Sequence, residues 1–254
     1  MLPTCLPKSS GCENLRVNTK LFRSFGNAPF NMSDNVFISE PVLQVVHLYD
    51  GLIDNRAWSQ PVAAQVERLG RRLHEGHRAR LPGAGVELSN WLPVSAGRSA
   101  QELFDAPLSL DDAFEAVSRA HGFIGWRAAS SNVERGAPDF EGAVELLLTA
   151  DLPGLEAALD AAPDLVRRRS HYGHRATLLH YLAANGVETY RQRVPRNAAN
   201  MTAVLLARGA DRLAKADMYG GSRTTRSMLI SSSHPAHAGV TADILKLLDG
   251  VGTA

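Results

Sequence analysis

Cysteine is almost absent from this chain of 254 residues, with only Cys5 and Cys12 near its start. The two cysteines form no CxxC pair and the nine histidines show no HExxH spacing. These absences argue against a structural zinc site and against a disulfide framework. We therefore expect a reducing, cytoplasmic compartment and no metal ion or cofactor.

Long apolar runs and an excess of one charge are also missing. No apolar stretch approaches the ~20 residues that span a bilayer, and Pro3, Pro7 and Gly11 interrupt any signal-peptide region. The 27 basic and 26 acidic residues leave a net charge of +1. Neither a membrane nor a nucleic acid is therefore expected as a partner. Aromatic residues make up only 6%, while Ala and Leu are plentiful, which favours close-packed helices.

Signatures of catalysis are lacking as well. There is no G-x-S-x-G turn for a nucleophilic serine. Gly220 and Gly221 lack the lysine of a phosphate-binding loop. The serines at 231–233 stand beside His234, but adjacent serines in a loop are typical turn formers. These observations argue against an enzyme.

The first part of the chain contains two segments of different composition, and the first of them ends at residue 40. Residues 1–40 are rich in Ser, Asn, Pro and Gly without periodicity, which predicts a disordered leader. Helical spacing of apolar residues begins at Pro41, and Pro61 is placed to start a second helix. Residues 81–107 predict either a long ordered connection or a stretch with one short helix near Ser99–Phe104, and Ser109 with Asp112 predicts a capping box. We expect an N-terminal helical region over 41–130.

One segment carries a family resemblance. Ala176–Gly186 reads A-T-L-L-H-Y-L-A-A-N-G and resembles the ankyrin-repeat pattern T-P-L-H-x-A-A-x-x-G, with Leu178 at the usual proline. Thr177 can cap a short helix, and Gly186 can end it with a positive φ. The resemblance implies that His180 joins neighbouring turns through side-chain hydrogen bonds.

A second segment extends the resemblance. The run Val204–Asp211 is similar to the ankyrin ending V-x-x-L-L-x-x-G-A-D. It implies that Leu205 and Leu206 pack inwards and that Gly209 caps the helix. The fold expected is all-α: a short ankyrin-type α-solenoid of about three atypical repeats over 139–252, preceded by the N-terminal helical cap region.

The repeats are irregularly spaced. Thr177 and Thr224, the expected starts of two first helices, are 47 residues apart, against about 33 in regular ankyrin arrays. The additional residues are expected at 188–196, with a similar insertion at 231–239. Insertions in repeat arrays map to loops on one face, which predicts that these two loops lie side by side.

Ankyrin arrays usually bind other proteins, so the resemblance implies a non-catalytic scaffold with an unidentified protein or peptide as partner. The loops concentrate residue types that are enriched at interfaces. The candidate partner-binding residues are Tyr172, His174, Arg175, Tyr190, Arg191, Arg193, Tyr219, Arg226 and His234. The alternative is that the tyrosines pack the long loops and the arginines are solvated.

A second hypothesis is an enzyme or regulator with a metal or small molecule between the two insertions. Its polar lining would be His174, Asp217, His234 and His237. Paired histidines three residues apart share a face only in a helix. The two pairs are His171 with His174 and His234 with His237. Gly173 and Pro235 make a helix improbable at both pairs, so no metal is expected.

Overall fold

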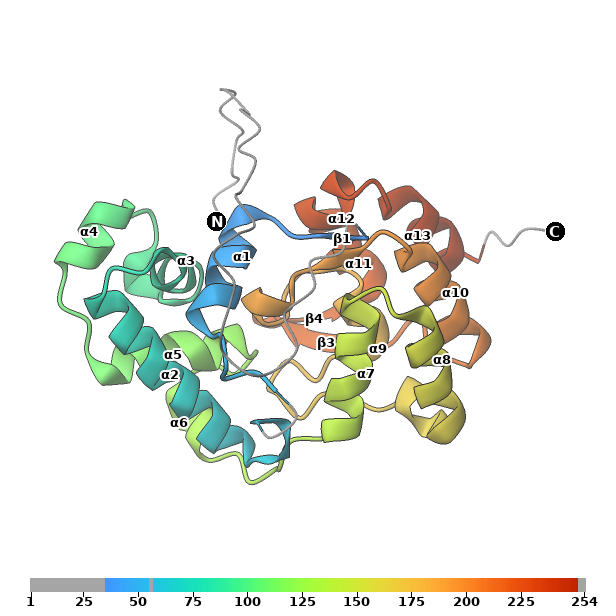
Figure 1. Ribbon diagram of the computed structural model, residues 1–254, viewed down its shortest axis with the longest axis horizontal. Coiled ribbons are helices and arrows are strands. Elements are labelled where there is room, and N and C mark those ends of the chain that lie inside the picture. Colours follow the sequence, from blue (N-terminus) through green and yellow to red (C-terminus); the bar gives the residue numbers. More distant parts are fainter. Residues whose placement is uncertain (1–34, 55–56, 251–254) are drawn as a thin grey trace, which may run out of the picture. The chain divides into compact units, whose positions relative to one another are not determined.

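The computed structural model describes residues 35–54 and 57–250, and most of them are helical (Figure 1). This confirms the helical part of the expected fold class. The predicted disorder of residues 1–34 lies outside the described residues. Val36 and Phe37 already form strand β1, and α1 begins at Glu40, so regular structure starts earlier than the sequence predicts.

Helices α1 to α6 build the N-terminal region. Their bounds are α1 Glu40–Leu48, α2 Val62–Arg78, α3 Pro82–Trp91, α4 Ala100–Asp105, α5 Leu110–Ala120 and α6 Trp126–Ser130, with short 3₁₀ turns η2 at Ala57–Ser59 and η3 at Pro93–Ser95. Val45, Val66 and Leu69 lie in their common core. Burial of these apolar side chains is what holds the region together.

Helix α3 falls in the stretch predicted to be mainly a connection. Its two glycines give it weak intrinsic helix propensity. Tertiary packing reverses the balance, because a Cβ on Gly83 would stand 2.2 Å from the Gln44 carbonyl oxygen of α1. Glycine therefore lets α3 close directly onto α1.

Two caps set the following helices. Ser99 and Glu102 form a complete capping box at the start of α4, the short helix that the sequence predicts there. Ser109 caps α5 by accepting from the Asp112 amide at 3.0 Å. Its hydroxyl also donates to the Asp112 carboxylate at 2.6 Å, which replaces the predicted return bond to the backbone.

Helices α7 to α13 build the C-terminal region. Their bounds are α7 Pro138–Leu148, α8 Leu152–Ala161, α9 Leu178–Tyr181, α10 Ala198–Ala207, α11 Thr225–Ser231, α12 Ser233–His237 and α13 Thr241–Leu248, with 3₁₀ turns η4 at Pro163–Val166 and η5 at Thr189–Arg191. Helix α7 contacts α8, α9 contacts α10, and α11 contacts α13. Along the chain, α7 contacts α9 and α9 contacts α11, while α8 contacts α10 and α10 contacts α13. We call the pair α7 and α8 the first unit, the pair α9 and α10 the second unit, and the pair α11 and α13 the third unit.

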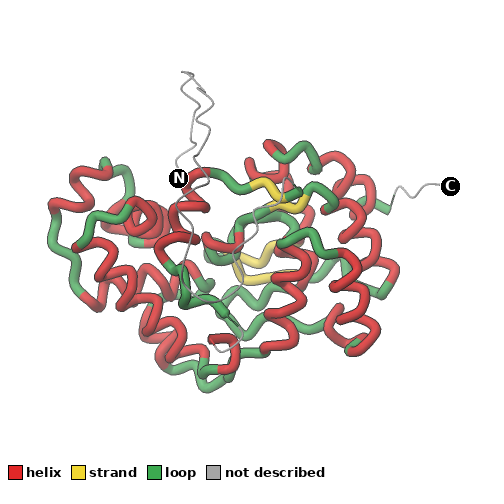
Figure 2. The backbone as a smooth tube through the Cα atoms, viewed as in Figure 1, coloured by secondary structure: helices red, strands yellow, loops and turns green. Residues whose placement is uncertain are grey.

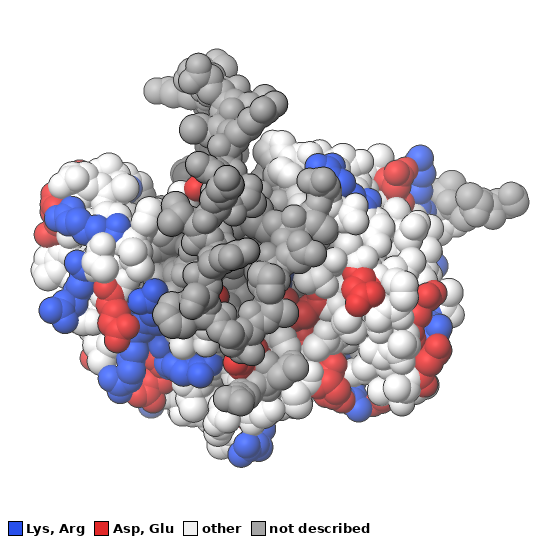
Figure 3. All heavy atoms as spheres, in the orientation of Figure 1, with Lys and Arg blue, Asp and Glu red and all other residues white. Residues whose placement is uncertain are grey.

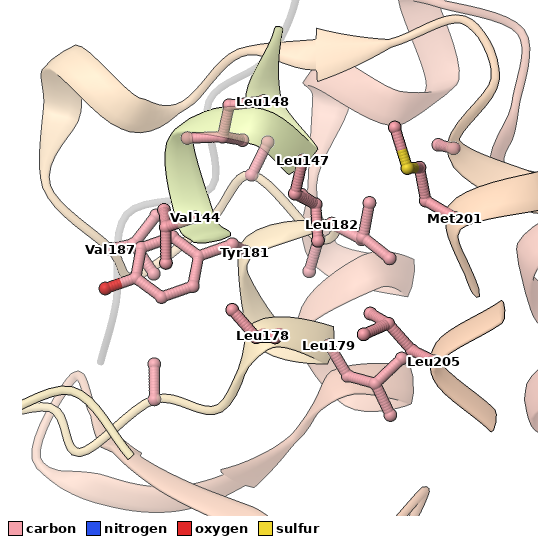
Figure 4. Close-up of a cluster of buried hydrophobic side chains, with 14 of the residues drawn as sticks. Val144, Leu147, Leu148, Leu178, Leu179, Tyr181, Leu182, Val187, Met201 and Leu205 are labelled. Atoms are coloured by element: carbon pink, nitrogen blue, oxygen red, sulfur yellow. The ribbon is translucent and has the colours of Figure 1, made fainter. Parts of the chain in front are cut away.

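Apolar side chains from successive units meet in one core. Figure 4 shows Val144 and Leu147 of α7 beside Leu178 and Leu182, with Leu205 of α10 across from them. All five side chains are buried. The second unit therefore packs on both of its neighbours through side chains that leave water together.

The strands are short and lie between the helices (Figure 2). Strand β1, Val36–Phe37, pairs antiparallel with β2, Val194–Pro195, in the first inserted loop. Strands β3, Lys215–Met218, and β4, Gly221–Thr224, form a hairpin. Its tip residues Tyr219 and Gly220 both have positive φ, as two-residue hairpin turns require. None of the described helices has the length and apolar character needed to cross a membrane.

Candidate functional site

The turn at Thr177 and His180 joins the second unit to the hairpin. His180 Nδ1 accepts from the Thr177 amide at 3.2 Å, which places the ring proton on Nε2. Nε2 then donates to the Arg223 carbonyl of β4 at 3.2 Å. Burial lowers the pKa of His180 to about 4, so the ring is neutral at pH 7.

The other residues of the ankyrin-like pattern have ordinary structural surroundings. Gly186 and Gly209 both adopt positive φ, at 71° and 89°. Leu205 is buried in the core and Leu206 is half-buried against it. Each of these positions has the local geometry that the resemblance implies.

The first inserted loop, residues 188–196, lies inside the protein and centres on Arg191. The Arg191 guanidinium is fully buried and pairs with Glu141 at 2.5 Å and with Glu145 at 3.1 Å, both on α7. It also pairs with Glu188 of its own loop at 3.3 Å. Arg193 adds a second bond to Glu145 at 2.5 Å. We call these five residues the Arg191 network.

Aromatic rings surround the Arg191 guanidinium. Its carbon lies 5.5 Å from the Trp58 ring centroid and 5.7 Å from those of Tyr181 and Tyr190. Cation–π attraction is strongest where the cation is removed from water, as it is here. Arg191 thus connects the first unit, the second unit and the N-terminal region.

The carboxylates of the network respond differently to their surroundings. Burial opposes ionisation of Glu188, but Arg191 and His174 outweigh it and lower the pKa of Glu188 to about 2. For Glu141, burial is the stronger influence and raises the pKa despite Arg191. For Glu145, the two arginines overcome burial and lower the pKa. The side chains of Arg191, Glu141 and Glu188 are almost completely enclosed, whereas that of Glu145 is 21% exposed.

Two buried histidines border the Arg191 network. His174 Nδ1 accepts from the Ala176 amide at 3.1 Å, so its Nε2 faces the Glu188 carboxylate at 3.5 Å as the protonated nitrogen. His121, at the end of α5, donates from Nδ1 to the Val117 carbonyl and faces the Tyr190 hydroxyl with Nε2. Burial lowers the pKa of His121 to about 4.

The hairpin tip touches the N-terminal region. The rings of Trp91 and Tyr219 are almost parallel, with centroids 6.1 Å apart. The Tyr219 hydroxyl donates to Asn185 at 2.7 Å, and Trp91 Nε1 donates to the Thr189 hydroxyl at 2.8 Å. Trp91 therefore contacts both the inserted loop and the hairpin.

The nine candidate partner-binding residues separate into two groups. Five lie in or beside the Arg191 network and are buried: Tyr172, His174, Tyr190, Arg191 and Arg193. Tyr219 and Arg226 are exposed, whereas Arg175 and His234 are half-buried. The structure therefore does not gather the nine on one surface, and the buried tyrosines pack the long loop.

The four residues of the proposed pocket are not brought together as a lining. The Asp217 amide donates to the His174 carbonyl at 2.8 Å, but the His174 side chain is buried and Asp217 is exposed. His237 packs on Phe37 of β1 at 6.0 Å between ring centroids. The described residues contain no group of three His, Cys, Asp or Glu side chains arranged to hold a metal ion.

The prediction that Pro235 prevents a helix at His234 and His237 is wrong. Both histidines lie in α12, with Pro235 at its third residue. Proline is tolerated in the first turn because the amide groups there have no partner within the helix. Asn185, three residues before the first insertion, donates to Ser231 at the start of the second, and the side-by-side placement of the two insertions stays a prediction.

Sequence reasoning missed the acidic half of the Arg191 network. Glu141 and Glu145 are four residues apart on α7, a helix whose other residues are mainly apolar. Two carboxylates on one face of such a helix were the available signal of buried charge. Trp58 and Trp91 carried no comparable signal.

No family model, curated protein or solved structure matches this chain.

Proposed function

We propose that this protein is a non-catalytic binding module of the ankyrin type, which binds a protein or peptide through its third unit. The observation that carries the proposal is the bond from His180 to the Arg223 carbonyl, which joins a capped Thr177 turn to the following hairpin. The successive contacts among the three helix pairs support it. Repeats that contact only their neighbours are what an ankyrin-type stack requires.

The exposed apolar side chains suggest where a partner binds. The side chains of Leu213, Tyr219 and Ile230 are 72%, 59% and 57% exposed. All three lie in one segment of 18 residues, which comprises the chain leading to the third unit and the first helix of that unit. Arg223 and Arg226 are exposed in the same segment. Single exposed apolar residues are ordinary, but tyrosine and arginine are residue types that are enriched at interfaces.

The burial of the Arg191 network supports binding over catalysis. The side chains of the network other than Glu145 are buried, so a substrate does not reach them in this conformation. A network of this kind fixes the inserted loop and keeps the stack rigid. A rigid surface loses little conformational entropy on binding.

Affinity capture with matched charge substitutions tests the proposal. Ile230→Asp places a carboxylate on the third unit and Leu213→Asp on the chain leading to it, while Val94→Asp and Val133→Asp do the same at exposed sites elsewhere. We expect a protein recovered by the wild type and by both controls to be lost with Leu213→Asp and Ile230→Asp. Equal recovery by all four variants would exclude this surface as the binding site.

A further inference from the structure

A cleft of about 590 Å³ lies in the N-terminal region, and its lining includes no residue of the Arg191 network or of the third unit. One wall is the last turn of α2 with the residues that follow it. The other wall runs from the end of α4 towards the start of α5, so that the lining residues lie within 74–80 and 104–108. The volume falls in the range of about 300–1,000 Å³ that is usual for sites of small molecules.

The α2 wall of the cleft carries hydrogen-bond donors. His74 and Arg78 are four residues apart on α2 and therefore share a face. His74 is half-buried and Arg78 is exposed, and neither side chain has an ion pair or a hydrogen bond within the described residues. The five N–H groups of a guanidinium form a planar fork that fits a carboxylate or a phosphate group. This wall is thus suited to an anion.

The carboxylate that lines the cleft already has partners. Asp105, at the end of α4, accepts from Arg80 at 2.6 Å and from Gln101 at 2.6 Å. Its negative charge is therefore balanced from within the protein. Among the charges that line the cleft, that of Arg78 is left for a ligand.

Arg80 occupies a position where helices commonly have glycine. Its φ is 53°, and its amide donates to the His77 carbonyl while the Leu81 amide donates to the Gly76 carbonyl. Glycine adopts this left-handed conformation without strain, whereas arginine adopts it at a cost. The side chain that is present at this cost lines the cleft and pairs with Asp105. The two backbone bonds also occupy carbonyl groups at the negative end of α2.

The opposite wall of the cleft is largely apolar and is held in place. Phe104 and Leu108 are half-buried and line the cleft together with Pro107. The Phe104 ring packs on the buried His77 ring with centroids 5.7 Å apart, and His77 Nε2 donates to the Leu103 carbonyl at 2.8 Å. Sites for small molecules typically combine such a pre-formed apolar surface with a few polar groups.

We propose that this cleft binds a small organic anion, in which a carboxylate or phosphate group is attached to an apolar or aromatic ring. The anionic group pairs with Arg78 and accepts from His74, while the ring lies against Phe104 and Leu108. Arg80 keeps the Asp105 charge from repelling the anion. The cleft and the third unit are separate sites, so this inference does not rest on the proposed function.

Titration of the isotope-labelled protein with phenyl phosphate, followed by NMR, tests the proposal. We expect saturable shifts of the amide signals at 74–80 and 104–108. Arg78→Gln should weaken the affinity about tenfold, because a charge-assisted hydrogen bond to the anion is lost. Arg71→Gln is the matched control, since Arg71 is an exposed arginine of α2 that pairs with Glu67 and does not line the cleft. This control should bind phenyl phosphate as the wild type does.

Inorganic phosphate and benzyl alcohol each lack one part of the proposed ligand, and both should bind more weakly than phenyl phosphate. Three results would each overturn the proposal. The first is the absence of saturable shifts in the two segments, and the second is an equal affinity of Arg78→Gln and Arg71→Gln. The third is binding of inorganic phosphate as tight as that of phenyl phosphate, because the apolar wall would then have no share.

Arg80→Gly separates a role in binding from a role in stability. Glycine suits the left-handed position, so the melting temperature should stay the same or rise. The affinity for phenyl phosphate should nevertheless fall, because Asp105 loses its partner and its charge faces the anion. An unchanged affinity in this variant would contradict the part that Arg80 has in the site.

Discussion

At the scale of residues, Arg191 determines how the inserted loop is held. A fully buried guanidinium is costly to remove from water, and its pairing with Glu141, Glu145 and Glu188 offsets that cost. Breaking such a pair leaves charges without compensation in a medium of low polarity. The surface pair of Arg226 and Asp249 has no comparable cost, because water solvates both partners.

Arg191→Met therefore should lower the free energy of unfolding by about 3–5 kcal/mol, since three carboxylates lose their common partner. Arg226→Met is the matched control and should change it by less than about 1 kcal/mol. Urea unfolding followed by circular dichroism measures both. Similar losses from the two variants would show that the network contributes no more than a surface pair.

Sequence reasoning succeeded at residue scale where the relevant contacts are local. The capped turn at Thr177, the positive φ of Gly186 and the inward Leu205 depend on neighbours a few residues away. It failed for Arg191 as a surface residue, while buried Tyr190 follows the alternative in which the tyrosines pack the long loops. The partners of Arg191 on α7 lie 46 and 50 residues earlier in the chain, and no spacing rule connects them.

At the scale of elements, two glycines allow the N-terminal region to meet the second unit. Gly122 follows α5 with a φ of 79°, and a Cβ there would stand 2.2 Å from the His174 amide nitrogen. A Cβ on Gly173 would stand 2.5 Å from the Phe123 amide nitrogen. The two backbones approach more closely than any side chain permits.

Gly122→Ala should consequently destabilise the protein by more than the cost of positive φ alone. Gly97 is a suitable control, because it has the same φ of 79° and a Cβ added there would meet no atom within 4 Å. Gly97→Ala should cost about 1–2 kcal/mol from backbone strain, and Gly122→Ala several-fold more. Thermal unfolding of both variants distinguishes them, and equal losses would contradict the close approach.

Helices could be predicted where apolar residues recur at helical spacing or where a capping residue marks the start of the helix. Helices α1, α2, α4 and α5 appear where apolar spacing and capping residues indicate them. Helix α3 was missed because its glycines weaken the local signal while strengthening its packing on α1. Helix α12 was missed because proline usually breaks a helix, although Pro235 occupies a first turn.

At the scale of the whole molecule, basic and acidic side chains are interspersed on the part of the surface that Figure 3 leaves uncovered by grey. The unusual charges are internal instead. Glu188, His121 and His180 each have a pKa that folding lowers. All three groups link stability to pH in the same direction.

Stability should accordingly fall in acid. His121 and His180 have pKa values near 4 when folded against an ordinary 6.5, so the unfolded chain binds more protons between those pH values. Their contribution is complete above pH 6.5 and is lost as pH falls to 4, and Glu188 extends the loss from 4.5 to 2. Burial raises the pKa of Glu87 on α3 to about 7, so Glu87 acts in the opposite direction between 4.5 and 7. The urea concentration at the midpoint of unfolding, measured from pH 7.5 to 4, reports the combined effect of these groups on stability. A midpoint that does not change with pH would contradict the prediction.

The arrangement of the whole molecule was the least predictable from the sequence. Its helical character follows from composition and periodicity, and the structure confirms it. The ankyrin-type stack stays a prediction, supported by the His180 bond and the contacts between units. The packing of the N-terminal region onto the inserted loop depends on distant pairs such as Trp91 and Thr189, which periodicity does not reveal.

The central claim is that a partner binds the third unit, and hydroxyl-radical footprinting of the protein with and without its captured partner tests it most directly. The exposed side chains of Leu213, Tyr219 and Ile230 should be protected in the complex, while Val94 and Val133 keep their reactivity. Protection of Val94 or Val133, with unchanged oxidation of the three side chains in and before the third unit, would contradict the claim.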